Sequence, residues 1–288
     1  MNRAIYVLIA LVVTVSLGIV AVPMAGEVGA DLGGPDAYGY SFIDSDEATG
    51  PVYDWIDITG MGSTGPTSDD SYVQVPIGFD FNFYGNTYDE VVISSNGYLT
   101  FNYTGFDGAD WTNDCIPDTE KPDLFIAPFW DDLDPQASGV IYYETLGTAP
   151  DREFVVEYHG ISHCCANDTG VTFEVILYEG CDNILFQYQD VVFDYPHDYA
   201  DWGVSATVGL ENSDGTDGLQ YSCDEASLHS DLAIMFSTGP KEEEGYPIVG
   251  VGGEAYPINK LTILAPVIAV LAGIAGASMV LRRRRAQS

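Results

Sequence analysis

Short acidic clusters are the part of this 288-residue sequence with the clearest capacity for chemistry. Ca²⁺ takes its ligands from carboxylate and carbonyl oxygens in flexible loops, and carboxylates two residues apart can converge on one ion at about 2.4 Å. We therefore predict Ca²⁺ as the cofactor. The alternative is that each cluster is a polar turn satisfied by its own backbone. The predicted ligands are Asp44, Asp46, Asp132, Asp134, Asn212, Asp214 and Asp217.

The clusters differ in how well they fit a metal site. Asp132 and Asp134 directly follow an apolar segment typical of a buried strand, which places them at a strand end. The run Asn212-Ser213-Asp214-Gly215 resembles the start of an EF-hand loop, but Cys223 stands where that loop carries its glutamate ligand. Asp69-Asp70 forms a further acidic cluster.

The sequence offers little support for catalysis. His159 and His163 are four residues apart, but they belong to a strand and its turn, so the helical spacing of zinc proteases does not apply. Cys164 directly follows His163, and adjacent residues rarely reach the geometry of a nucleophile and its base. Carboxylate pairs suited to glycoside hydrolysis arise by chance among 44 acidic residues. We therefore predict a non-catalytic protein.

The charge distribution narrows the possible partners. All 44 acidic residues lie between Glu27 and Glu254 with only three basic ones, Lys121, Arg152 and Lys241, so this part carries a net charge of −41. Binding to phosphates requires the opposite sign, and nucleic acid is therefore excluded as a partner. The same field opposes docking on anionic lipids or acidic glycans.

Both ends of the chain carry apolar segments. Residues 1–26 combine an early arginine, an apolar stretch and small residues, which indicates a signal peptide; an uncleaved anchor is the alternative, because the stretch is long. Residues 261–281 carry no charge and, as a helix, span a hydrocarbon core of about 30 Å. Four arginines then open a basic tail, 282–288, which we expect to be cytoplasmic. Residues 238–260 are rich in Gly, Pro and Glu and are typical of a stalk. We predict a single-pass cell-membrane protein whose domain, 27–237, faces outwards.

An outward-facing domain permits disulfides and glycans. Cys115 and Cys223 are the best intrachain pair among the five cysteines, because a strand of about 26 Å separates Cys181 from Cys164 and Cys165. The adjacent Cys164 and Cys165 either close a ring or reach another chain, and an odd count leaves at least one cysteine outside the intrachain bridges. Glycosylation sequons begin at Asn102 and Asn167.

The elements that must position these residues are strands. Apolar residues alternate with others over 77–84, 154–159 and 171–178, which is the period of half-buried antiparallel strands. Turn signals such as Asn96-Gly97 separate the strands, and no helical pattern precedes residue 260. We predict an all-β fold, an antiparallel two-sheet β-sandwich of jelly-roll type, between a signal segment and one C-terminal transmembrane helix. Further strands are expected at 90–94, 97–102, 124–130, 139–145, 183–190, 203–211 and 231–236.

Most of the predicted domain resembles a known extracellular family. The segments VVISSNGYLTF (91–101), LFIAPFWDDLDP (124–135), TFEVILYEGCDNILFQYQDV (172–191) and SATVGLENSDG (205–215) follow one another as in the NIDO domain, which is named after nidogen. The most specific element is APFW-x-D-x-D. The resemblance implies a non-catalytic role in matrix or cell-surface adhesion, although the EGF-like modules of the animal proteins are missing.

The C-terminal segment carries a second resemblance. VGGEAYPINKLTILAP, followed by the apolar segment and the arginines, looks like the anchors of many archaeal and some bacterial surface proteins. This resemblance implies a prokaryotic cell surface and leaves the role of the domain open.

Together these features predict a cell-surface-anchored, non-catalytic protein that mediates adhesion or recognition of envelope or matrix components. Its partners would be the cytoplasmic membrane, through the C-terminal helix, and a surface protein or glycan. One alternative is a carbohydrate-binding module whose exposed aromatic side chains stack on sugar rings, and a secreted hydrolase is another. The aromatic residues in question are Trp55, Trp111, Trp202 and those of the 195–199 loop.

Overall fold

The structure is a computed structural model that describes residues 31–102, 110–165 and 169–239. The predicted signal peptide, transmembrane helix and basic tail lie outside these residues, as do most of the predicted stalk and the sequon at Asn167. Within the described ranges, no helix is both long enough and apolar enough to cross a membrane.

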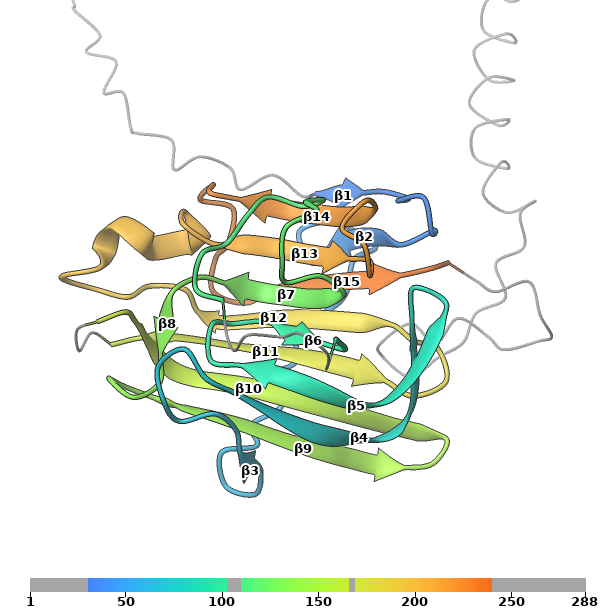
Figure 1. Cartoon of the computed structure of the whole chain (residues 1–288), viewed down its shortest axis with the longest axis horizontal. Helices are drawn as coiled ribbons and strands as arrows, with labels where there is room; N and C mark the ends of the chain where they lie inside the picture. The colour runs from blue at the N-terminus through green and yellow to red at the C-terminus, as the bar shows by residue number, and fades with distance from the viewer. Residues whose placement is uncertain (1–30, 103–109, 166–168, 240–288) are drawn as a thin grey trace, which may run out of the picture.

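Two antiparallel sheets make up the described part of the chain (Figure 1). The larger sheet has the order β1-β2-β15-β12-β11-β10-β9-β3, and β8 pairs with β10 beside this path. Its strands are β1 (Leu32–Gly33), β2 (Ser41–Asp44), β3 (Ser63–Thr64), β8 (Leu133–Asp134), β9 (Val140–Thr148), β10 (Asp151–His163), β11 (Val171–Tyr178), β12 (Ile184–Asp190) and β15 (Leu232–Ser237). The smaller sheet has the order β14-β13-β7-β6-β5-β4. Its strands are β4 (Tyr72–Phe83), β5 (Asn86–Ser94), β6 (Leu99–Thr100), β7 (Phe125–Trp130), β13 (Thr207–Glu211) and β14 (Gly218–Cys223).

The main core lies between the two sheets. Alternate residues of β4, from Ile77 to Phe83, are buried while most of their neighbours face solvent, as the alternation predicts. They belong to the same apolar cluster as Phe154 and Phe173 of the larger sheet. The predicted all-β, two-sheet sandwich is therefore confirmed, and the jelly-roll designation stays a prediction.

The larger sheet is covered on its outer face as well. The prediction of half-buried strands is wrong for β10 and β11, where every residue over 154–158 and 171–177 is buried. A second apolar cluster, which includes Val155 and Ile176, lies on the side opposite the core. The irregular segment 51–59 packs there, and we call it the strap. It hides alternate residues that would otherwise face water.

The connections also differ from the expectation at one place. The strand predicted at 203–211 begins only at Thr207, because a short 3₁₀ helix, η1 (Asp198–Gly203), and the turn that follows it precede the strand. Strands β1, β2, β3, β8 and β14 were not among those predicted.

The two ends of the sandwich are distinct. Antiparallel pairing sets Leu232 against Tyr188 and Phe236 against Ile184, so the loop after β12 and the C-terminal end of β15 lie at opposite ends. Figure 1 shows η1 at the left and the end of β15 at the right. We call the end that holds η1 the distal end. It is formed by residues 68–72, 94–98, 131–138, 163–165 and 191–205.

Candidate functional site

A buried histidine organises the distal end. His163, the last residue of β10, is 8% exposed. Its Nδ1 lies 3.1 Å from the Cys164 carbonyl oxygen and its Nε2 lies 3.3 Å from Asp131 Oδ1. The other carboxylate oxygen of Asp131 accepts a hydrogen bond of 2.7 Å from the Ser205 hydroxyl. Because the carbonyl and the carboxylate only accept, both ring nitrogens of His163 donate, which defines a protonated imidazolium.

Electrostatics favour the same protonation state. Burial lowers the pKa of His163, but the hydrogen bond and the charge of Asp131 outweigh it, with help from the Cys164 carbonyl and Asp132, so the pKa is raised above its ordinary value. The imidazolium offsets part of the negative charge that Asp131 and Asp132 bring to this end of the domain.

This network is not arranged for nucleophilic catalysis. A serine nucleophile needs a histidine nitrogen that accepts its proton. Here Ser205 donates to Asp131, and both nitrogens of His163 are engaged elsewhere. Cys164, the residue beside His163, is bonded to Cys165 in a disulfide. The contacts therefore describe a structural and electrostatic role.

Aromatic side chains cover the network from the loop after β12. The His163 ring lies 5.0 Å from that of His197, 5.8 Å from that of Tyr199 and 5.5 Å from that of Phe193, measured between ring centroids. His197 is buried, whereas Tyr199 is 61% exposed and packs in a T-shaped arrangement against both histidines. The loop is thus anchored on the imidazolium.

An acidic group and the adjacent cysteines lie next to this network. Carboxylate oxygens of Asp69, Asp70 and Asp132 lie within 4.8 Å of one another, and Asp69 is equally close to the sulfurs of Cys164 and Cys165. Burial raises the pKa of Asp132 to about 6, with His163 lowering it and Asp70 raising it. Burial, followed by the charges of Asp70 and Asp134, also raises the pKa of Asp69. These carboxylates repel one another.

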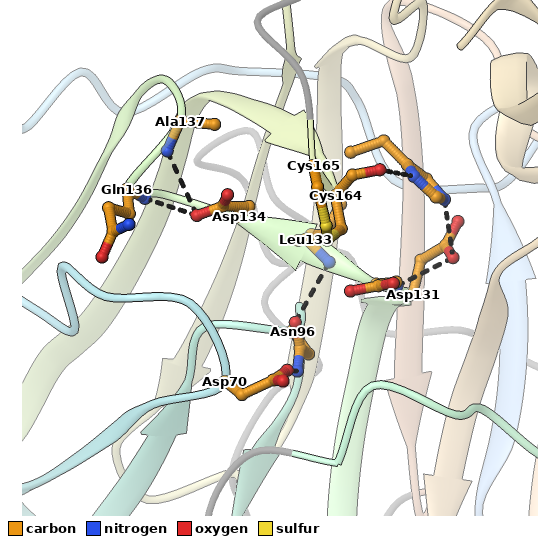
Figure 2. The surroundings of a disulfide bond; sticks show 11 residues. Asp70, Asn96, Asp131, Leu133, Asp134, Gln136, Ala137, Cys164 and Cys165 are labelled. Carbon is orange, nitrogen blue, oxygen red and sulfur yellow. Dashed lines mark hydrogen bonds and ion pairs between the residues drawn. A yellow bond between two sulfur atoms is a disulfide. The ribbon is translucent and has the colours of Figure 1, made fainter.

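The Asn96 side chain links Asp70 of the acidic group to β8 (Figure 2). Its side-chain amide donates to Asp70 at 3.0 Å, and its oxygen accepts the N–H of Leu133 at 3.0 Å. The Cys164 N–H donates to the Asp132 carbonyl at 2.7 Å. Sequence reasoning identified Asn96-Gly97 only as a turn; the burial of this asparagine could not be predicted from the turn signal.

The predicted ligand Asp134 has a local role. Its Oδ1 accepts the N–H groups of Gln136 at 2.8 Å and Ala137 at 3.1 Å (Figure 2). Asp134 is not part of the cluster of carboxylates in which Asp132 lies. Among the described residues, the structure brings Asp132 to Asp69 and Asp70 instead.

The predicted ligands Asp44 and Asp46 also have other partners. Asp44 is fully buried; its Oδ1 accepts the N–H of Asp46 at 3.1 Å and its Oδ2 accepts the Tyr221 hydroxyl at 3.0 Å. The Asp46 carboxylate lies 3.1 Å from His229 Nε2. These contacts fix the turn after β2, and calcium at this position stays a prediction.

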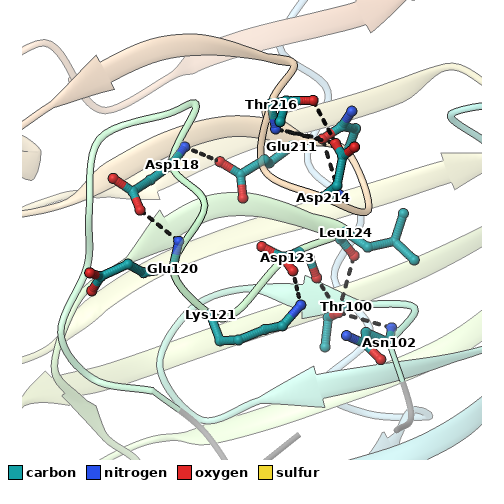
Figure 3. Close-up of polar contacts among 11 residues, drawn as sticks. Thr100, Asn102, Asp118, Glu120, Lys121, Asp123, Leu124, Glu211, Asp214 and Thr216 are labelled. Carbon is teal, nitrogen blue, oxygen red and sulfur yellow. Dashed lines mark hydrogen bonds and ion pairs between the residues drawn. The ribbon is translucent and has the colours of Figure 1, made fainter. Parts of the chain in front are cut away.

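The loop 212–217 is closed by its own side chains (Figure 3). Asn212 Oδ1 accepts the Thr216 N–H at 3.2 Å, and Asp214 Oδ1 accepts the Thr216 hydroxyl at 2.6 Å. Asp217 points elsewhere and accepts the N–H groups of Ala37 and Tyr38, both at 3.0 Å. These are the contacts of a polar turn, and calcium here likewise stays a prediction.

The disulfide predicted between Cys115 and Cys223 is present, with Cα atoms 5.5 Å apart. It ties the loop after β6 to the end of β14. The Cys164–Cys165 ring, one of the two alternatives for this pair, is formed as well. Cys181 is exposed and belongs to neither disulfide of the described chain. Asn102 is half-buried at the edge of the described residues, and its glycosylation stays a prediction.

The fold and its two disulfides define an antiparallel, two-sheet β-sandwich domain. The chain belongs to the NIDO-related family: the family model described as NIDO related matches residues 40–246, more than half of the chain. Membership of this family suggests an extracellular adhesion-type module. No curated protein and no solved structure matches the chain.

Proposed function

We propose that the chain is a non-catalytic recognition module, held at the surface of a prokaryotic cell, that binds a component of the envelope or matrix through its distal end. The observation that carries the proposal is the exposure of three large aromatic side chains on one loop. Tyr195 is 86% exposed, Tyr199 61% and Trp202 51%. Tyrosine and tryptophan are enriched at binding interfaces, and hot spots concentrate in them.

The position of this loop supports the proposal. It lies at the end of the sandwich opposite Ser237, from which the chain continues toward the predicted stalk and the predicted membrane segment 261–281. An anchor on that side would present the aromatic loop away from the membrane. Two further exposed aromatic residues lie at the same end: Tyr72, beside Asp70, and Trp111, whose neighbour Asp110 accepts a hydrogen bond from Trp130.

Hydrogen bonds within the chain also fix the conformation of the loop. The Phe193 N–H donates to Asp201 at 2.8 Å, and the Trp202 N–H donates to the Val191 carbonyl at 2.8 Å. A loop fixed in this way loses little conformational entropy on binding, which favours affinity. The ring of the buried His163 also packs against His197 and Tyr199 of this loop.

A carbohydrate ligand is the second candidate. Exposed aromatic rings offer flat apolar faces, and Asp194 and Asp198, beside Tyr195 and Tyr199, offer hydrogen-bond acceptors for hydroxyl groups. Trp55, by contrast, is half-buried and stacks on Tyr53 at 6.4 Å, so it belongs to the strap. A neutral glycan fits this surface better than an acidic one, because the domain is strongly negative.

The proposal is tested with the detergent-solubilised full-length chain, in a pull-down from a native envelope fraction and on a glycan array. We expect the triple change Tyr195→Ala, Tyr199→Ala and Trp202→Ala to weaken binding at least tenfold, and Tyr195→Ala alone to weaken it measurably. Tyr38→Ala is the matched control, since Tyr38 is an exposed tyrosine beside Tyr84 at the other end of β4. Binding that survives the triple change, or that falls equally with Tyr38→Ala, would contradict the proposal. A signal on the array identifies the ligand as a glycan.

A further inference from the structure

We propose that reduction of the Cys164–Cys165 disulfide creates a binding site for a thiophilic divalent cation of the Zn²⁺ and Cd²⁺ class, with Asp69 as the third ligand. The two sulfur atoms and a carboxylate oxygen of Asp69 lie within 4.8 Å of one another. A tetrahedral Zn²⁺ with bonds of about 2.3 Å to sulfur holds two sulfurs about 3.8 Å apart. Adjacent cysteines reach that separation once the bond between them is broken.

Asp69 is suited to complete the site. Its Oδ1 atom is buried and accepts no hydrogen bond from the described residues. A buried carboxylate oxygen without a partner is costly, and a cation would supply the missing interaction. The neighbouring carboxylates of Asp70 and Asp132 add negative charge that favours a cation over an anion.

The backbone around the cysteines is fixed independently of the disulfide. The Cys164 N–H donates to the Asp132 carbonyl, and β10 pairs with β8 through Ser162 opposite Asp134 and His163 opposite Leu133. Reduction therefore leaves Cys164 beside Asp69, with Cys165 the next residue in the chain. Cys165 is exposed, so a soluble thiol reductant can reach the disulfide.

The chemistry consists of one redox step and one binding step. An external dithiol donates two electrons; the Cys164–Cys165 bond breaks, each sulfur takes up one proton, and the dithiol closes to its own disulfide. The cation then displaces both protons and binds the two thiolates and the Asp69 carboxylate. In the oxidised chain the same place offers carboxylate oxygens, which suit hard ions, so oxidation state selects the class of ion.

This inference is independent of the proposed function, because its readout is metal binding and not ligand capture. The full-length chain carrying Cys181→Ser is titrated with Cd²⁺ before and after treatment with dithiothreitol and its removal without oxygen. Binding is followed by the ultraviolet charge-transfer absorption of thiolate-bound Cd²⁺, and free thiols are counted in parallel. We expect one Cd²⁺ per reduced chain and no charge-transfer band from the oxidised chain.

Two variants in the same background locate the site. Cys164→Ser with Cys165→Ser retains the Cys115–Cys223 pair and is expected to abolish the band, which controls for reduction elsewhere. Asp69→Asn is expected to raise the Kd at least tenfold while leaving the thiol count unchanged. The inference is overturned by a band in the untreated chain, by no gain of thiols at Cys164 and Cys165 on reduction, by a band that survives in the double variant, or by an unchanged Kd for Asp69→Asn.

Discussion

Glu174→Gln should stabilise the domain increasingly as the pH rises from 5 to 8. Glu174 lies on β11 under the strap and is fully buried. Its Oε1 accepts the Ile56 N–H at 3.2 Å and the Gln187 side-chain amide at 2.7 Å, while its Oε2 accepts no hydrogen bond from the described residues. Burial raises the pKa of Glu174 to about 8, against smaller lowering contributions from the hydrogen bonds of Ile56 and Gln187. The carboxyl is therefore mostly neutral below that pH.

The magnitude follows from the two pKa values. The ordinary pKa is 4.5, so between 4.5 and about 8 the folded chain holds a proton that the unfolded chain has released. The stabilisation that this group provides is complete below pH 4.5 and is lost as the pH rises toward 8, at up to about 1.4 kcal/mol per pH unit. From pH 5 to pH 8 the loss amounts to about 3.5 kcal/mol, an upper value because denatured chains retain some structure. Glutamine has nearly the same shape and no charge, so the variant escapes this loss.

Urea denaturation at pH 5, 6.5 and 8, at constant ionic strength, measures the difference. Other buried carboxyls titrate in the same range; burial raises the pKa of Glu211 to about 7, for example, so the slope of the unaltered chain alone is not diagnostic. Glu225→Gln, at an exposed position, is the control, because it changes the net charge equally. Refutation would be a free-energy difference between Glu174→Gln and the unaltered chain that stays constant across these pH values and matches that of Glu225→Gln.

Two further predictions concern the acidic group at the distal end and the Cys115–Cys223 disulfide. Ca²⁺ at millimolar concentration should raise the melting temperature more than NaCl of matched ionic strength, by the equivalent of about 2.7 kcal/mol at a hundredfold excess over Kd. Asp132→Asn should remove this extra stabilisation and Asp214→Asn should retain it. Equal shifts with both salts would exclude a specific Ca²⁺ site. Replacing Cys115 and Cys223 together by alanine opens a bridge between residues 108 positions apart and should cost about 2–5 kcal/mol in urea unfolding; a loss below about 1 kcal/mol would show that the bridge adds little to stability.

The sequence was sufficient where local pattern determines structure. The alternation in β4 identifies its buried face, because side chains of a strand point alternately to its two sides. The pairing of Cys115 with Cys223 followed from the length of the strand that separates Cys181 from the other cysteines. Both inferences use geometry that a short stretch of chain fixes by itself.

The contacts of His163 at the distal end could not be predicted from local pattern, because the residues that make them are far apart in the chain. His163 appeared in the sequence as a histidine beside a cysteine, and its partners Asp131 and Ser205 lie on other elements. Asp132 was predicted to act with Asp134, two residues away, yet the structure sets it beside Asp69 and Asp70. Which strand ends meet depends on sheet order, and alternation carries no information about sheet order.

The strap shows which signal in the sequence was overlooked. Glu157, Glu174 and Gln187 lie directly opposite one another on β10, β11 and β12 and form a polar row across the strands. Alternation assigns this row to the outer face of the sheet, together with apolar residues such as Val155 and Ile176. Apolar side chains on that face would be unfavourable if it were exposed to water. The row accepts the N–H groups of Ile58, Ile56 and Asp54 in turn, so it satisfies the backbone of a segment that belongs to no sheet. Carboxyl and amide groups among apolar residues on the outer face of a sheet thus indicate an irregular segment that crosses the strands and covers them. The pH dependence of the stability difference between Glu174→Gln and the unaltered chain measures how completely the strap excludes water.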